Sequence, residues 1–161
     1  FEMNVFQELE FLPEPFNGMF VSLNITKTDG ESTLDVDNGQ VTFPFRKLSD
    51  KNSNLSIGYD QGKLDMRLSA VSRTPYLDYL ADEDGPGDVQ EELSLDNIRY
   101  TDDHTQYDFN LKYKINDNFS VKFDISNITD EPEFYYWGSP DRLSQYDVYG
   151  TTYSIGIRYN L

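Results

Sequence analysis

Apolar and polar residues alternate through the last stretch of the chain, residues 149–161. Successive side chains of a strand point to opposite faces, so this period of two predicts a strand with one apolar and one polar face. The apolar positions form a C-terminal signature, Tyr153, Ile155, Ile157, Tyr159 and Leu161. A soluble sheet shows this alternation when its apolar face packs against a second layer, and an outer-membrane barrel shows it when that face meets lipid.

The same period of two predicts six further strands. They lie at residues 1–11, 19–26, 54–59, 64–70, 107–115 and 119–126. The alternation is cleanest at 107–115, where five apolar residues interleave with four polar ones. No segment shows a convincing helical period. The sequence therefore predicts an all-β chain of about seven antiparallel strands.

The connections between these strands alternate in length. Short connections lie at 13–18, 60–63 and 116–118, and long polar ones at 28–51, 73–104 and 127–148. In an up-and-down meander, alternate connections lie at the same end of the sheet, so the short turns gather at one end and the long loops at the other. This is the layout of an outer-membrane barrel, whereas a Greek-key sandwich mixes connection lengths. The alternative is a soluble or secreted all-β sandwich that binds a ligand or protein partner through its long acidic loops.

Composition excludes several other classes of protein. Lys and Arg total 13 against 29 Asp and Glu, and this formal net charge of −16 argues against nucleic-acid binding. The chain has no cysteine, so it has no disulfide framework and no Cys-based metal site. No window approaches the roughly 18 apolar residues that a membrane helix needs. The mean hydropathy of −0.65 leaves a barrel open, because alternation hides an apolar face from an average.

Residues 106–161 resemble the C-terminal end of TonB-dependent outer-membrane receptors. The resembling features are the hairpin turn NDN at 116–118, the motif NITDEP at 127–132 and the terminal strand YGTTYSIGIRYNL at 149–161, in this order. The segment FLPEPFNGMFVSLNITKT at 11–28 is similar to an earlier hairpin of the same receptors. The family's plug domain and TonB box are absent from this stretch. The chain also begins inside an alternating pattern without a basic leader, and we expect it to be a piece of a longer protein.

The resemblance implies a fold, a place and a function. Residues 1–161 would be the C-terminal segment of a 22-stranded transmembrane β-barrel in a bacterial outer membrane. The whole receptor would take up a scarce nutrient, such as an iron-siderophore, cobalamin or an oligosaccharide, with TonB-coupled energy and without catalysis. Its partners would be outer-membrane lipid and lipopolysaccharide, its own plug domain, and TonB through the missing N-terminal part.

Two sets of candidate functional residues follow. The side chains expected to face lipid are Tyr107, Phe109, Leu111, Phe123, Ile155 and Ile157. The candidates for ligand binding are the loop aromatics Phe134, Tyr135, Tyr136 and Trp137, which could stack on a sugar ring or on a siderophore's aromatic groups. An aromatic belt or a cluster that anchors the loop is the competing interpretation of these four residues.

The sequence predicts no catalytic, cofactor or metal residue. The only histidine, His104, is expected at the plain surface, and no nucleophile motif accompanies it. The acidic segments 35–39 and 82–85 have some calcium-ligand character, but neither carries a full calcium-binding loop. Solvated surface is therefore the preferred interpretation of both segments.

Overall fold

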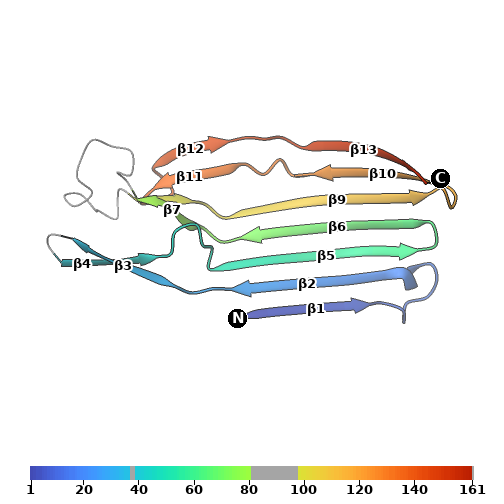
Figure 1. The fold of residues 1–161 in the computed structure, drawn as a ribbon, viewed down its shortest axis with the longest axis horizontal. Coiled ribbons are helices and arrows are strands. Elements are labelled where there is room, and N and C mark those ends of the chain that lie inside the picture. Colours follow the sequence, from blue (N-terminus) through green and yellow to red (C-terminus); the bar gives the residue numbers. More distant parts are fainter. Residues whose placement is uncertain (37–38, 81–97, 161) are drawn as a thin grey trace.

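Seven strands form one antiparallel sheet in the computed structural model, which describes residues 1–36, 39–80 and 98–160. The order across the sheet is β1-β2-β5-β6-β9-β10-β13 (Figure 1). The bounds are β1 (Glu2–Glu8), β2 (Met19–Lys27), β5 (Lys51–Gln61), β6 (Leu64–Arg73), β9 (His104–Lys114), β10 (Phe119–Ser126) and β13 (Thr152–Tyr159). Each strand pairs with its neighbour in chain order. The prediction of an all-β, antiparallel chain is confirmed.

Apolar side chains run in continuous rows across one face of this sheet. Direct cross-strand pairing produces the row Met19, Tyr59, Met66, Leu111, Phe123 and Ile155. The adjacent row is Val21, Ile57, Leu68, Phe109, Ile125 and Tyr153. Because a slip of one residue would turn a whole strand over, this register keeps every strand's apolar set on the same face. All six side chains expected to face lipid lie on this face.

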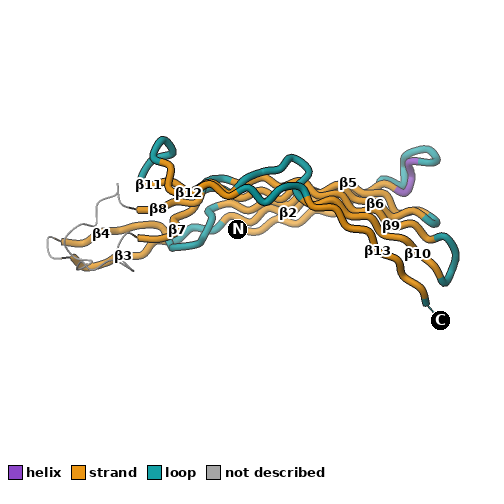
Figure 2. The backbone as a smooth tube through the Cα atoms, turned by 90° about the horizontal axis from the view of Figure 1, so that it is seen from above, coloured by secondary structure: helices purple, strands orange, loops and turns teal. Residues whose placement is uncertain are grey.

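The apolar face has no second protein layer over it in the described part of the chain. Ile155 is 77% exposed and Ile157 70% exposed. Figure 2 shows the seven strands as a single layer. The described buried hydrophobic side chains belong to other strands: Phe43, Leu77, Ile98 and Tyr136. A sandwich would bury the inner faces of two sheets against each other, and the seven-stranded sheet does not do so.

The opposite face of the seven-stranded sheet is polar. Ser56 and Ser69 share a hydrogen bond of 3.0 Å across β5 and β6. On the neighbouring strands, Asn110 donates to Asp124 at 2.9 Å and Ser154 donates to the other oxygen of the same carboxylate at 3.2 Å. These cross-strand hydrogen bonds satisfy polar groups within the sheet, so the face is stable beside water.

One glycine on the polar face makes room for an aromatic ring. A Cβ on Gly58 would lie 2.2 Å from Cζ of Phe20. The Phe20 ring also has the guanidinium carbon of Arg67 at 5.5 Å from its centroid. We expect Gly58→Ala to lower the free energy of unfolding by about 1–3 kcal/mol, because the ring must leave this site. Denaturant unfolding measures the loss.

Gly156 provides the matched control for Gly58. It also lies in a strand of the same sheet, but a Cβ there would meet only Cβ of Lys122, at an ordinary contact distance of 3.9 Å. Gly156→Ala should change the free energy of unfolding by less than about 0.5 kcal/mol. Equal losses in the two variants would show that the ring of Phe20 is not the cause.

The connections follow the predicted alternation. The short ones span residues 9–18, 62–63 and 115–118, and the first contains a 3-10 turn, η1 (Phe16–Gly18). The long connections carry six strands that the sequence pattern did not predict. These are β3 (Glu31–Val36), β4 (Gly39–Pro44), β7 (Tyr76–Leu80), β8 (Ile98–Thr101), β11 (Glu133–Trp137) and β12 (Leu143–Asp147).

Four of the added strands lie beyond the long-loop end of the seven-stranded sheet. They form a sheet in the order β12-β11-β8-β7, which we call the loop sheet. This order repeats β13-β10-β9-β6, and each short strand adjoins the corresponding long strand in the chain (Figure 1). The hairpin of β3 and β4 packs on one face of the loop sheet, where Phe43 joins Leu77 and Ile98 in a hydrophobic core.

Candidate functional site

The four aromatic candidates for ligand binding lie on one strand, β11, and therefore divide between its two faces. Tyr136 stacks on Tyr100 with ring centroids 5.5 Å apart, and Phe134 lies 6.2 Å from Tyr136. The ring of Trp137 instead contacts the ring of Tyr79 on β7, with centroids 5.8 Å apart. The four residues therefore do not form one surface. The even-numbered pair packs into the loop sheet, and the odd-numbered pair lies on its other face.

The aromatic residues on the same face as Tyr136 pack within the loop sheet. Tyr136 is 8% exposed, and its partner Tyr100 packs against the core of Leu77 and Ile98. Burial raises the pKa of both phenols, and the carboxylate of Asp102 raises the pKa of Tyr136 further. The interpretation of these aromatics as a cluster that anchors the loop fits Phe134 and Tyr136.

These raised pKa values predict how the loop sheet responds to alkali. An unfolded tyrosine loses its proton near pH 10, whereas half-buried Tyr100 and buried Tyr136 keep theirs to higher pH. The folded state then binds more protons than the unfolded state, so stability falls as the pH rises through about 10. Absorbance of tyrosinate should show a late-titrating component that shrinks in Tyr136→Phe.

The other face of the loop sheet holds an arginine between two tyrosine rings. The guanidinium carbon of Arg99 lies 5.3 Å from the ring centroid of Tyr79 and 5.0 Å from that of Tyr135. Trp137 lies directly opposite Arg99 in the register of β8 and β11. We call Asp78, Tyr79, Arg99, Tyr135 and Trp137 the Arg99 cluster.

An ion pair holds the arginine of this cluster. Nε of Arg99 donates to Oδ2 of Asp78 at 2.7 Å, and Nη2 donates to the same oxygen. The two side chains are 24% and 11% exposed. Asp78 lies at an irregularity of β7 between Leu77 and Tyr79, where the extra residue redirects a side chain. The third nitrogen, Nη1, has a 3.5 Å contact with Oε1 of Gln145 on β12.

The Arg99 cluster lies on the same side of the molecule as the polar face of the seven-stranded sheet. At the junction, Nη2 of Arg73 donates to Oε2 of Glu133 at 2.7 Å, and the Arg73 guanidinium carbon lies 5.1 Å from the Tyr76 ring centroid. Nδ1 of His104 lies 3.8 Å from Oε1 of Glu133 and 3.3 Å from the carbonyl oxygen of Pro132. His104, expected at the plain surface, has a side chain only 14% exposed.

The electrostatic environment of the cluster is acidic. Glu133 and Asp147 pair directly across β11 and β12. Burial raises the pKa of Tyr135, and the charges of Glu133 and Asp147 raise it further. With Arg99 neutralised by Asp78, this face offers aromatic rings and hydrogen-bonding groups to a ligand but little positive charge.

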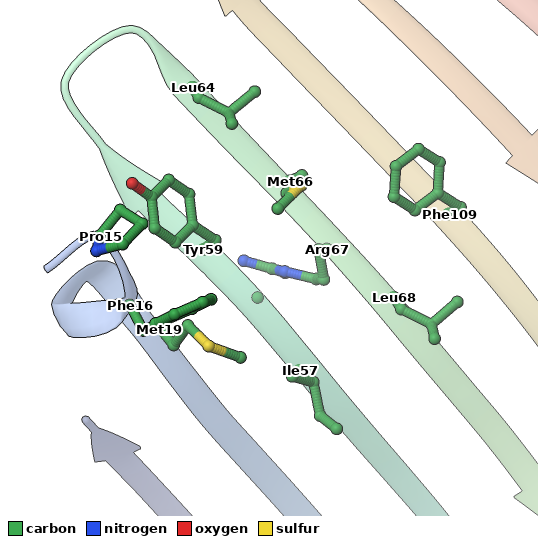
Figure 3. A pocket seen from close by; sticks show the side chains of 11 residues that line it. Pro15, Phe16, Met19, Ile57, Tyr59, Leu64, Met66, Arg67, Leu68 and Phe109 are labelled. Carbon is green, nitrogen blue, oxygen red and sulfur yellow. The ribbon is translucent and has the colours of Figure 1, made fainter. Parts of the chain in front are cut away.

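A separate apolar groove of about 550 Å³ lies on the apolar face at the short-turn end (Figure 3). Phe16 from the 3-10 turn lies at its rim, and Met66 and Phe109 come from neighbouring strands. Arg67 also borders the groove, but its guanidinium stacks on Phe20, which lies on the polar face. The groove is therefore lined mainly by apolar side chains, and the hydroxyl group of Tyr59, which also lines it, donates to Gln61 at 2.8 Å.

Other predicted features have simple positions. Tyr153, Ile155, Ile157 and Tyr159 of the C-terminal signature alternate along β13, and Leu161 lies outside the described residues. Asp35 accepts a hydrogen bond from Gln40 at 2.8 Å, while residues 37–38 and 82–85 of the acidic segments lie outside the described part. Within residues 1–36, 39–80 and 98–160, no group of three His, Cys, Asp or Glu side chains could hold a metal ion.

Two further results concern membrane-spanning helices and similarity to known proteins. Within the described residues, no helix has the length and apolar character needed to cross a membrane. Comparisons with protein-family models, with curated proteins and with solved structures find no match to this chain.

Proposed function

We propose that residues 1–161 form the C-terminal barrel wall and extracellular loops of a TonB-dependent active-transport receptor in a bacterial outer membrane. The observation that carries this proposal is the apolar face of the seven-stranded sheet, which crosses the strands in continuous rows and lies exposed. Apolar surface kept in water costs roughly 25 cal/mol per Å². Hydrocarbon removes this cost, and the polar face then lines an aqueous lumen.

On two strands a tyrosine lies near each end of the row of apolar residues, which supports the proposal. On β9 the pair is Tyr107 and Tyr113, and on β13 it is Tyr153 and Tyr159. The two members of each pair are six positions apart, a distance of roughly 20 Å along a strand. Aromatic side chains gather at both interfaces of membrane barrels, where their polar ends reach water.

The proposed receptor works through parts inside and outside this stretch. The chain supplies wall and loops, and the free edges of β1 and β13 pair with further strands to close a 22-stranded barrel. A plug domain occupies the lumen and moves under TonB-coupled pull. The loops capture a scarce nutrient such as an iron-siderophore, cobalamin or an oligosaccharide, and no step is enzymatic. The outward face contacts membrane lipid and lipopolysaccharide.

Single cysteines test the orientation of this arrangement. Residues 1–161 contain no cysteine, so a cysteine introduced here into the receptor encoded by the complete gene is the only thiol of this stretch. Asp141→Cys lies between β11 and β12 at the long-loop end, and Asp117→Cys lies between β9 and β10 at the short-turn end. A membrane-impermeant maleimide should label the first on intact cells and the second only after lysis. The parent receptor gives the background.

Two outcomes of this experiment would contradict the proposal. Recovery of the protein in the soluble or secreted fraction would overturn the proposal and favour the sandwich that binds through its acidic loops. Labelling of Asp117→Cys on intact cells would also contradict it, because the short turns would then face outward rather than toward the periplasm.

A further inference from the structure

We propose that the Arg99 cluster binds a neutral oligosaccharide, with a sugar ring stacked on Trp137 and Tyr135 and its hydroxyl groups bonded to Arg99, Asp78 and Gln145. This inference deepens the proposed function by naming the class of ligand, and it rests on that function. The argument has three parts: the aromatic surface, the hydrogen-bonding groups within it, and the charge around it.

The aromatic rings of the cluster are held in position before any ligand binds. Arg99 lies between the rings of Tyr79 and Tyr135, and Tyr79 contacts Trp137 at 5.8 Å. Each of these contacts limits the rotation of a side chain, so binding requires little additional ordering. The C–H face of a pyranose ring is apolar and flat enough to pack on such rings, while its hydroxyl groups point outward at the rim.

Hydrogen-bonding groups lie at the edges of the rings. Nε and Nη2 of Arg99 are both directed to Oδ2 of Asp78, whereas Nη1 has only the 3.5 Å contact with Gln145, at the limit of a hydrogen bond. Exposed Gln145 donates to Asp147 at 2.6 Å and so has a fixed side chain. Two neighbouring hydroxyl groups of a sugar can accept from Nη1 and donate to the Asp78 carboxylate.

The charge of this face selects against anionic ligands. Asp78 already neutralises Arg99, the cation within the cluster, and Arg73 pairs with Glu133 at the junction, so the remaining charge on this face is the carboxylate of Asp147. This carboxylate would repel a ferric chelate with several negative charges, or a polyuronate. Such a ligand would also have to compete with Asp78 for Arg99. An uncharged ligand avoids both costs.

The test is calorimetric titration of the purified full-length receptor with chosen probes. The neutral probes are malto-, cello-, xylo-, manno- and laminari-hexaose, and the anionic probes are hexagalacturonate and a ferric tris-catecholate. We expect at least one neutral hexasaccharide to bind more tightly than about 1 mM, and both anionic probes to bind more weakly. If no neutral probe reaches that affinity, or an anionic probe binds best, the inference is wrong.

Variants locate the binding surface. Trp137→Ala should weaken binding of the neutral probe at least tenfold, and exposed Gln145→Ala, which disturbs no core, should weaken it several-fold. Tyr146→Ala is the matched control, because Tyr146 is an exposed aromatic that contacts Phe134 on the opposite face of the loop sheet. Equal affinities of the Gln145→Ala and Tyr146→Ala variants would place the sugar elsewhere and overturn the inference.

Failure of this inference is distinguishable from failure of the proposed function. The cysteine labelling above reports whether the protein spans the outer membrane, independently of any ligand. A correctly oriented receptor that rejects all neutral probes contradicts only the class of ligand. A soluble protein that binds a neutral hexasaccharide through Trp137 contradicts only the transport function.

Discussion

Receptor carrying Ile155→Arg should be almost absent from the outer membrane. Ile155 ends the apolar row that begins at Met19 and crosses β5, β6, β9 and β10. Its neighbour in that row is Phe123, so an arginine there places a charge within the apolar face. In the proposed receptor this face meets lipid, where a central arginine costs about 2–4 kcal/mol. Quantitative immunoblotting of outer-membrane fractions measures the loss.

The adjacent residue supplies a matched control. Ser154 lies on the polar face of the same strand and donates to the carboxylate of Asp124 at 3.2 Å. Ser154→Arg brings the same side chain to the polar face, within reach of that carboxylate, and should assemble at nearly the parent level. The contrast tests the environment of the apolar face. In water, an arginine at the 77% exposed position of Ile155 would be harmless, so equal levels of the two variants would contradict the lipid-facing assignment.

Alternation predicted the seven long strands because each has one apolar and one polar face over many residues. The strand β9 spans 11 residues, enough for the period of two to repeat clearly, whereas the pattern located β5 only at 54–59 of its 11 residues. The alternation of connection lengths then gave the meander and the common end of the short turns. These features follow from local pattern alone, which is why the sequence sufficed for them.

The alternation of apolar and polar residues did not predict the loop sheet, because its strands are short and irregular. Its strands have four or five residues, and two carry irregularities, at Leu77/Tyr79 and at Tyr135/Tyr136. The run Phe134 to Trp137 is aromatic at every position, so no alternation shows which side chains are buried. Both faces of this sheet use aromatics, one in a core and one around Arg99. Only tertiary pairing distinguishes them.

The Arg99 cluster could not be derived from spacing. Asp78 and Arg99 are 21 residues apart, and both lie in the long polar connection expected at 73–104. Their pairing depends on the register of β7 with β8 and on the irregularity that redirects Asp78. The burial of this charged pair therefore depends on the fold. The sequence alone shows only a carboxylate and an arginine near tyrosines.

Removing that carboxylate should loosen the loop sheet while leaving the seven-stranded sheet intact. Asp78→Asn keeps the shape of the side chain but leaves the Arg99 guanidinium, 24% exposed, without its counter-ion between two tyrosine rings. Breaking a buried pair costs more than a surface pair, and we expect a local loss of about 2 kcal/mol, after allowance for partial exposure. Hydrogen exchange of the amides in β7, β8 and β11 should then accelerate roughly 30-fold.

A double variant separates charge from packing in this prediction. If the unpaired guanidinium causes the loss, Arg99→Met added to Asp78→Asn should restore part of the protection, because no isolated charge remains. Exchange in β9 and β10 should stay at the parent rate in both variants, since those strands contact neither side chain directly. Asp141→Asn, in the exposed turn of the same sheet, controls for loss of a carboxylate. Equal acceleration in Asp141→Asn, or further acceleration in the double variant, would show that the ion pair does not hold the cluster.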